Sequence, residues 1–251
     1  RERGDIDARS IIDRARQTIG GDHGYTSVQD FVRTKISELK DTDQYTKRIW
    51  DSQPQYVEVW VEKDALATIF SSIANGYRVI TYPSRGYSSY TKVYEAINNR
   101  FTWYHDRPIT ILHFSDHDPS GLNMTDDIQS RLARYGSHAR VKRIALTYQQ
   151  VRQFGLEPMP TKLNDSRQKE YSLQYGNQCW ELDALPPNEL QNIIRDAIKS
   201  YIDVSRWNKA FKEIEEEKRS LQKRFRSKQV ASLIKNLDSL LVDGSKGNAK
   251  Q

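Results

Sequence analysis

The spacing of apolar residues changes several times along the chain, and each change predicts a different element. In residues 1–50, apolar side chains recur every three or four positions, which predicts helices. In residues 55–62 the spacing becomes every second position, with Val57, Val59 and Val61 on one side of the segment. That period predicts a β-strand.

Three further segments have the composition of strands, and a helical pattern separates each from the next. The strands are expected at residues 77–82, 108–114 and 139–146, and the helices at residues 63–75, 90–103 and 119–135. A strand–helix repeat of this kind predicts a parallel sheet with helices on both faces. We therefore expect an α/β fold, Rossmann-like, with about four parallel strands.

The rest of the chain is expected to extend this core. The predicted regions are a helical N-terminal extension (1–54), the α/β core (55–150), an irregular stretch (151–185) with an amphipathic helix (190–204) that completes the domain (151–204), and a C-terminal region (205–251) with one long charged helix (207–241) and a disordered end (244–251). Because the chain begins at Arg1 without a methionine, we expect it to be part of a longer protein.

Charge is unevenly distributed. The 251 residues include 39 Lys and Arg against 33 Asp and Glu, a net charge of +6, but residues 205–251 hold 12 basic and 6 acidic residues. The preceding 204 residues therefore carry 27 of each sign. A basic excess suggests a polyanionic partner, although this one belongs to a helix whose periodic apolar residues favour packing.

The single cysteine, Cys179, excludes an internal disulfide, and no stretch approaches the ~18 apolar residues of a membrane helix. We expect an intracellular protein of the cytoplasm or nucleoid, without a membrane partner.

Acidic residues follow two of the predicted strands. Glu62 ends the first, and Asp116 and Asp118 follow the third. Open α/β sheets bind ligands at the carboxyl ends of their strands, and neighbouring strands lie about 4.8 Å apart. Carboxylates brought this close repel one another unless a cation lies between them, and oxygen ligands suit Mg²⁺ or Mn²⁺. The alternative is that Asp118 only caps the helix beginning at Pro119 and Glu62 is a solvated strand end.

Further charged residues are candidates for the same edge. Lys63 and Arg85 lie in predicted loops there and are candidates for DNA phosphate contacts, with a solvated charge or a pair with Asp64 as the alternative for Lys63. A polar cluster in 162–171 adds Lys162 and Arg167 as DNA-facing candidates. Glu181 and Asp183 either assist a second metal or form structural salt bridges, and we favour the salt bridges. His117 is expected to point away from the two aspartates.

Three motifs together resemble a TOPRIM domain, the metal-binding α/β module shared by topoisomerases, primases and several nucleases. They are VEKDAL (61–66), SRGY (84–87) and DHDPSG (116–121). The Asp-x-Asp-Pro-x-Gly form and the Arg-Gly-Tyr loop are most similar to the A subunit of type IIB topoisomerase (topoisomerase VI) and its meiotic double-strand-break relatives. WELDAL (180–185) resembles uncharacterised phage and prokaryotic members of that group. The resemblance covers about residues 55–190.

The resemblance implies a division of labour at the acidic edge. Asp116 and Asp118 would hold Mg²⁺ against a DNA phosphate, and Glu62 would complete the site as a ligand or as a general acid/base. It also implies DNA as partner, with a homodimer and an ATPase subunit as further options. The topoisomerase relatives use a Tyr on a preceding winged-helix domain, and nothing around Tyr25 or Tyr45 resembles that motif.

The expected function is therefore Mg²⁺-dependent DNA cleavage, topoisomerase-like or nucleolytic. Two alternatives stay open. One is a non-catalytic TOPRIM scaffold or DNA-binding subunit that depends on an absent domain. The other is a nucleotide-sugar transferase that uses the Asp-x-Asp motif for a metal–diphosphate.

Overall fold

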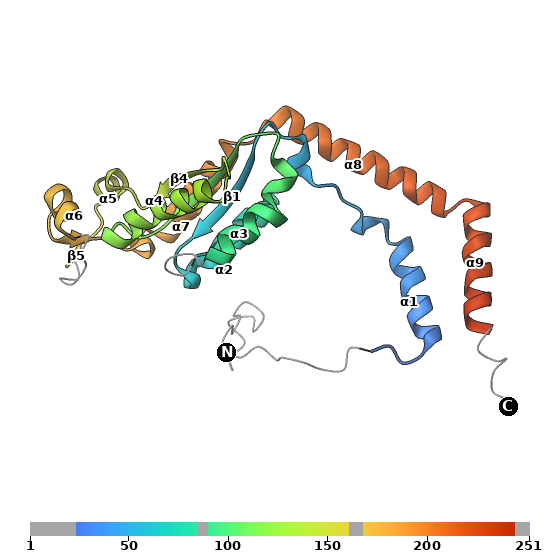
Figure 1. Ribbon diagram of the computed structural model, residues 1–251. Coiled ribbons are helices and arrows are strands. Elements are labelled where there is room, and N and C mark those ends of the chain that lie inside the picture. Colours follow the sequence, from blue (N-terminus) through green and yellow to red (C-terminus); the bar gives the residue numbers. More distant parts are fainter. Residues whose placement is uncertain (1–23, 85–89, 161–167, 244–251) are drawn as a thin grey trace, which may run out of the picture. The chain divides into compact units, whose positions relative to one another are not determined.

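The computed structural model describes residues 24–84, 90–160 and 168–243. The chain divides into two compact units, which are described separately (Figure 1). The sheet unit comprises Thr46–Glu215, and the helical unit combines Arg1–Tyr45 with Glu216–Gln251. The region boundaries expected from the sequence, after residues 54, 150 and 204, stay a prediction.

Four parallel strands form the sheet, as predicted. They are β1 (Tyr56–Val61), β2 (Thr81–Pro83), β3 (Ile109–Phe114) and β4 (Arg140–Ala145), in the order β2-β1-β3-β4. β1 and β3 are the central pair, with Tyr56 beside Ile109 and Val61 beside Phe114. Every residue of these two strands is buried. Burial on both faces is usual for a parallel sheet covered by helices.

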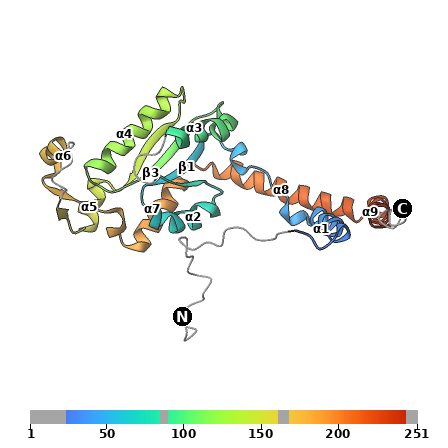
Figure 2. The same cartoon turned by 60° about the horizontal axis from the view of Figure 1, so that its bottom comes forward.

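Helices cover both faces of the sheet. Figure 2 shows α3 (Tyr90–Asn99) and α4 (Pro119–Arg134) on one face, and α2 (Ala67–Gly76) and α7 (Pro187–Lys199) on the other. Contacts of α3 with α4 and of α2 with α7 agree with this arrangement. Short 3₁₀ turns precede β1 (η4, Ile49–Ser52), precede α2 (η5, Asp64–Leu66) and follow α3 (η6, Phe101–Tyr104). The predicted mixed α/β class is confirmed.

A carboxylate lies in the middle of β1, one of the two central strands. Glu58 is fully buried, and Arg100 donates to both of its oxygens, Nε to Oε1 at 2.6 Å and Nη2 to Oε2 at 2.9 Å. The Tyr56 hydroxyl and the Trp60 indole N–H add donors at 3.1 and 3.0 Å. A buried charge needs such compensation because its desolvation is costly.

The second strand was expected at residues 77–82, which is wrong at its start. β2 begins only at Thr81 because residues 77–79 form the turn that follows α2. The backbone N–H groups of Tyr77 and Val79 both donate to the carbonyl of Ala74, and Arg78 has a φ of 51°. These hydrogen bonds complete the helix terminus and delay the strand.

The stretch 151–185, expected to be irregular, contains regular elements. They are α5 (Tyr148–Phe154), a short antiparallel pair β5 (Met159–Pro160) and β6 (Gln178–Cys179), α6 (Gln168–Tyr175) and η7 (Leu182–Ala184). Thr147 and Gln150 form a capping box at the start of α5, and Gly155 ends it with φ 59°. The helix predicted at 190–204 is α7, which both begins and ends earlier.

The helix predicted over 207–241 is two helices. α8 (Val204–Phe225) begins in the sheet unit, and α9 (Lys228–Asp243) lies in the helical unit. Ser227 breaks the run, because its side chain accepts from the N–H of Val230 as a helix cap does.

In the helical unit, α1 (Val28–Lys40) packs against α9, and η3 (Thr42–Gln44) follows α1. The helices predicted in residues 1–23, and the expected disorder of 244–251, lie outside the described residues. Within the described ranges, the helices are all too short or too polar to cross a membrane.

Candidate active site

Three acidic side chains meet at the carboxyl end of the central strands. Glu62 directly follows β1, and its backbone N–H donates to the carbonyl of Phe114 at 2.8 Å. Asp116 and Asp118 lie in the loop between β3 and α4. The charges of both aspartates act on the pKa of Glu62. The neighbouring strands therefore bring together the three carboxylates that the sequence singled out.

Each aspartate uses one carboxylate oxygen for a backbone hydrogen bond. Asp118 is the N-cap of α4, and its Oδ1 accepts from the N–H of Gly121 at 2.6 Å. Pro119 occupies the first turn, where a missing N–H costs nothing. Asp116 Oδ1 accepts from the N–H of Leu182 at 2.7 Å. The predicted helix cap is confirmed, and Asp118 is a cap that also faces the other two acids.

Glu62 is held in a place that disfavours its charge. Its Oε2 atom is buried and has no hydrogen-bond partner among the described residues. Burial raises the pKa of Glu62 to about 7, and the charges of Asp116 and Asp118 add to the shift. A hydrogen bond from the backbone of Asp116 and the charge of Arg143 oppose it. Burial also raises the pKa of Asp116, against the hydrogen bond from Leu182. Glu62 therefore exchanges its proton near neutral pH.

Arg143 of β4 holds the loop between β3 and α4 through hydrogen bonds. The sequence pattern did not single this residue out. Its Nη1 donates to Ser115 Oγ at 2.6 Å and to the carbonyl of Gly121 at 2.8 Å, and its Nη2 donates to the carbonyl of Asp116. Its Nε donates to the carbonyl of Leu146 at 3.0 Å. Burial lowers the pKa of Arg143 to about 10, against the pull of the three acids. A signal existed, since a charged residue between Val141 and Ala145 interrupts the inward side of a strand.

Gly121 allows the loop to fold back on itself. A Cβ at this position would lie far inside van der Waals contact of the Asp116 carbonyl oxygen. The first and sixth residues of the DHDPSG segment therefore approach too closely for any other residue at the sixth position. This close approach gives the glycine of the motif a physical reason.

Lys63 forms ion pairs at the same edge. Its ammonium lies 2.7 Å from Glu181 Oε2 and 2.7 Å from Asp183 Oδ1. Burial alone would lower the pKa of Lys63, but its hydrogen bonds to Asp183 and Glu181 raise it overall. The structure thus gives Glu181 and Asp183 the salt-bridging role that the sequence favoured, with Lys63 as their partner. A pair with Asp64 was one of the alternatives for Lys63, and the ion pairs observed are with Glu181 and Asp183 instead.

His117 points away from the acids, as expected. It is buried, it exchanges two backbone hydrogen bonds with Trp180, and its Nδ1 lies 2.9 Å from the Tyr171 hydroxyl. Tyr148 and Tyr175 complete an aromatic cluster around the ring. Burial lowers the pKa of His117 to about 4, so the ring is neutral at physiological pH. This cluster anchors residues 178–182 against the loop of the two aspartates.

Three candidates lie outside the described residues, namely Arg85, Lys162 and Arg167. In the described ranges, no group of three or more His, Cys, Asp or Glu side chains forms a ready-made metal site. The donor chemistry nevertheless fits Mg²⁺ or Mn²⁺: Glu62, Asp116 and Asp118 are all carboxylates, and one carries an orphaned buried oxygen. Mg²⁺ usually keeps several waters and takes only one or two carboxylates, with substrate phosphates completing the shell.

The fold and the edge define an α/β protein with an acidic cluster at the carboxyl ends of its central parallel strands. No protein-family model and no curated protein matches this chain.

Proposed function

We propose that this chain is a TOPRIM-type enzyme that cleaves DNA with the help of Mg²⁺ or Mn²⁺. The observation that carries the proposal is that Glu62, Asp116 and Asp118 lie at the same edge, where the charges of the two aspartates help to raise the pKa of Glu62 to about 7. Acids gathered in this way raise each other's pKa, and a cation between them relieves that cost. The motifs that resemble TOPRIM proteins contain all three residues.

Asp116 and Asp118 would hold the cation. When bound, a divalent cation neutralises charge on phosphoryl oxygens and orients the scissile phosphate. Because each aspartate already accepts one backbone N–H, its carboxylate is oriented before any ligand arrives. Preorganisation of this kind lowers the cost of binding and of charge stabilisation.

Glu62 is suited to the proton transfer. A pKa of about 7 lets the carboxyl both take and give a proton at physiological pH, which is the range in which a general acid/base works best. The pKa of Asp116 is also raised by burial, but a hydrogen bond from Leu182 favours its charged form. The environments of the two groups therefore support different roles, a proton carrier and a cation ligand.

We favour cleavage by water over transfer to Tyr171. Tyr171 lies beside the acidic loop, but its hydroxyl is a hydrogen-bond donor to the carbonyl of His117 at 2.9 Å. Burial raises the pKa of Tyr171 further above its usual value. A tyrosine held in this way is a poor nucleophile.

The test is a nicking assay on supercoiled plasmid with Mg²⁺ or Mn²⁺, combined with calorimetric titration of the metal. Wild type should nick the plasmid and bind the cation at millimolar concentration. Glu62→Gln combined with Asp116→Asn and Asp118→Asn should abolish both. A matched control removes three exposed carboxylates elsewhere, with Asp126→Asn, Glu157→Gln and Asp196→Asn, and should keep both.

The remaining outcomes decide against the proposal in identifiable ways. Metal binding without nicking would favour the non-catalytic scaffold or DNA-binding subunit. Binding of a nucleotide-sugar that depends on Asp116 and Asp118 would favour the transferase. Equal metal binding by wild type and the triple variant would remove the metal site itself.

A further inference from the structure

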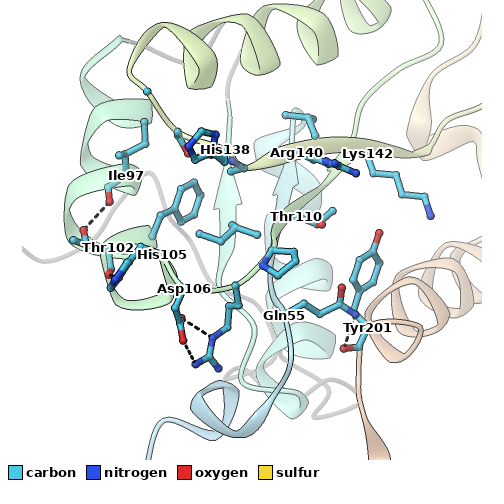
Figure 3. Close-up of a pocket in the computed structure, with 18 of the residues that line it drawn as sticks. Gln55, Ile97, Thr102, His105, Asp106, Thr110, His138, Arg140, Lys142 and Tyr201 are labelled. Atoms are coloured by element: carbon cyan, nitrogen blue, oxygen red, sulfur yellow. Dashed lines mark hydrogen bonds and ion pairs between the residues drawn. The ribbon is translucent and has the colours of Figure 1, made fainter.

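A cavity opens at the end of the sheet opposite the acidic edge. It has a volume of about 980 Å³ and is lined by the segments that precede β1, β3 and β4 (Figure 3). Gln55, Pro108 and Ala139 mark these three strand entries. A volume of this size is at the upper end of the range of small-molecule sites.

Basic residues form one wall of this cavity. Arg140 and Lys142 are exposed residues of β4, and both line it. In the sheet register Arg140 lies beside Thr110 of β3, so the two side chains lie on the same face. Figure 3 shows both basic side chains on the β4 side of the cavity, with His138 at the start of that strand. This wall therefore offers two cations, an imidazole and a hydroxyl to one ligand.

These charges have no acidic counterpart within the cavity. Among the described residues that line it, Asp106 is the only acid, and Arg107 donates to both of its oxygens at 2.9 Å. In the described part of the chain, neither Arg140 nor Lys142 forms an ion pair with a carboxylate. An anionic ligand would supply the missing negative charge.

The negative ends of the nearby helices do not account for the two cations. α4 and α7 both end toward this side of the sheet, and each has basic residues in its own last turn. These are Arg131 and Arg134 in α4 and Lys199 in α7. The basic residues in the last turns already offset the negative charge of the helix ends, so Arg140 and Lys142 are not needed for that purpose.

Apolar and aromatic side chains also line the cavity, among polar residues such as Asn98 and Thr102. Phe101 and Ile109 are buried residues that line the cavity, and Ile97 lies opposite β4 in Figure 3. Tyr201, which follows α7, holds its ring with the Lys142 ammonium 5.8 Å from the ring centroid. The cavity therefore combines apolar and aromatic side chains with a group of cations.

We propose that this cavity binds a small phosphorylated molecule with a flat apolar part, of the nucleoside diphosphate class. The phosphates would lie against Arg140 and Lys142, and the flat part against the apolar and aromatic residues of the lining. Because the protein supplies these cations itself, binding needs no divalent metal. The proposal rests on the cavity alone and is independent of DNA cleavage at the acidic edge.

The test is calorimetric titration of the whole chain with ADP in the presence of EDTA. Wild type should bind ADP, and Arg140→Ala combined with Lys142→Ala should weaken binding at least tenfold. Lys142→Glu, a second variant at an exposed position, should weaken it further. Adenosine and pyrophosphate, titrated separately, should each bind at least tenfold more weakly than ADP.

Two control variants establish whether ADP binding depends on this cavity. Arg152→Ala with Lys209→Ala removes two exposed positive charges elsewhere and should change ADP affinity less than twofold. Asp116→Asn with Asp118→Asn should bind ADP as wild type does, whatever it does to plasmid nicking. The proposal is overturned by absence of heat with millimolar ADP, by equal weakening in the Arg152 and Lys209 control, or by loss of binding in the aspartate variant. Pyrophosphate binding as tightly as ADP would overturn the nucleoside part.

Discussion

The carboxylate of Asp116 accepts a hydrogen bond from the backbone N–H of Leu182, 66 residues later in the chain, with 2.7 Å between the two atoms. A hydrogen bond to an ionised group contributes about 1.5–3 kcal/mol. This one joins the loop after β3 to the segment after β6. The acidic edge is thus built from three separate parts of the chain, which are the ends of β1 and β3 and residues 178–183.

Glu62→Gln should change how stability depends on pH in metal-free protein. The pKa of Glu62 is about 7 in the folded chain against 4.5 for an ordinary glutamate, so between these values the folded state binds more protons than the unfolded state. The free energy of unfolding of wild type therefore falls as pH rises from 4.5 to 7. Glutamine does not titrate, so the variant should show a smaller fall, measured by urea denaturation at about pH 5 and about pH 8.

At about pH 8 the same variant should be more stable than wild type by about 1 kcal/mol, a figure reduced for the solvent-exposed part of the side chain. Millimolar Mg²⁺ should reverse that order, because a bound cation favours the ionised carboxylate. Parallel pH profiles of wild type and variant would contradict the raised pKa.

Arg143→Lys should destabilise the fold by about 2–4 kcal/mol. The three nitrogens of the guanidinium donate hydrogen bonds to Ser115, Gly121, Asp116 and Leu146. A lysine has a single nitrogen and cannot replace all of these hydrogen bonds. Urea denaturation measures the loss. Arg152→Lys, at an exposed position of α5, is the matched control and should stay within about 0.5 kcal/mol of wild type. Equal stability of the two variants would show that Arg143 does not hold the loop.

Gly121→Ala should cost about 1–3 kcal/mol, because the added methyl group meets the carbonyl of Asp116 and the backbone must shift. Gly76→Ala provides the comparison, since a Cβ there meets nothing within 4 Å. Alanine also suits a helix better than glycine, so Gly76→Ala should be neutral or stabilising by up to about 1 kcal/mol. Thermal denaturation of both variants compares them, and a neutral Gly121→Ala would refute the close approach.

Lys63 and Asp183 should be coupled in a double-mutant cycle. Their ion pair is partly exposed, so we expect a coupling free energy of about 0.5–1 kcal/mol between Lys63→Met and Asp183→Asn. Raising the salt concentration to about 1 M should reduce it, because ions screen exposed pairs. Additive effects of the two substitutions would mean that Lys63 is available for another partner.

The long apolar runs predicted the centre of the fold well. β1, β3 and β4 begin and end within one residue of expectation. β1 and β3 are buried on both faces, and such strands leave a clear apolar pattern in the sequence. Local hydrogen bonds decided the errors. Val79 belongs to a helix terminus, Ser227 is a cap inside a helical pattern, and α6 buries only Tyr171. Such features are weak in the sequence because each depends on one local hydrogen bond or on one buried residue.

The acids of the site were predictable, and their supports were not. Glu62 directly follows β1, and Asp116 and Asp118 lie in the loop after β3. The rule that open α/β sheets bind ligands at the carboxyl ends of their strands therefore predicts them. Arg143 lies in a strand already rich in charge, where its inward direction is easily overlooked. The amide of Leu182 has no signal at all, since every residue except proline carries the same N–H group.

The buried pair of Glu58 and Arg100 has a consequence for residues well beyond it. Sliding β1 by one position would turn Glu58 toward the opposite face and separate it from its guanidinium, which costs about 3–5 kcal/mol for a buried ion pair. The same slip would displace Glu62 by about 3.3 Å along the edge and reverse its direction. The ion pair of Glu58, four residues before Glu62, thus fixes the register of β1 in the sheet. It thereby fixes the position of the Glu62 carboxyl relative to Asp116 and Asp118.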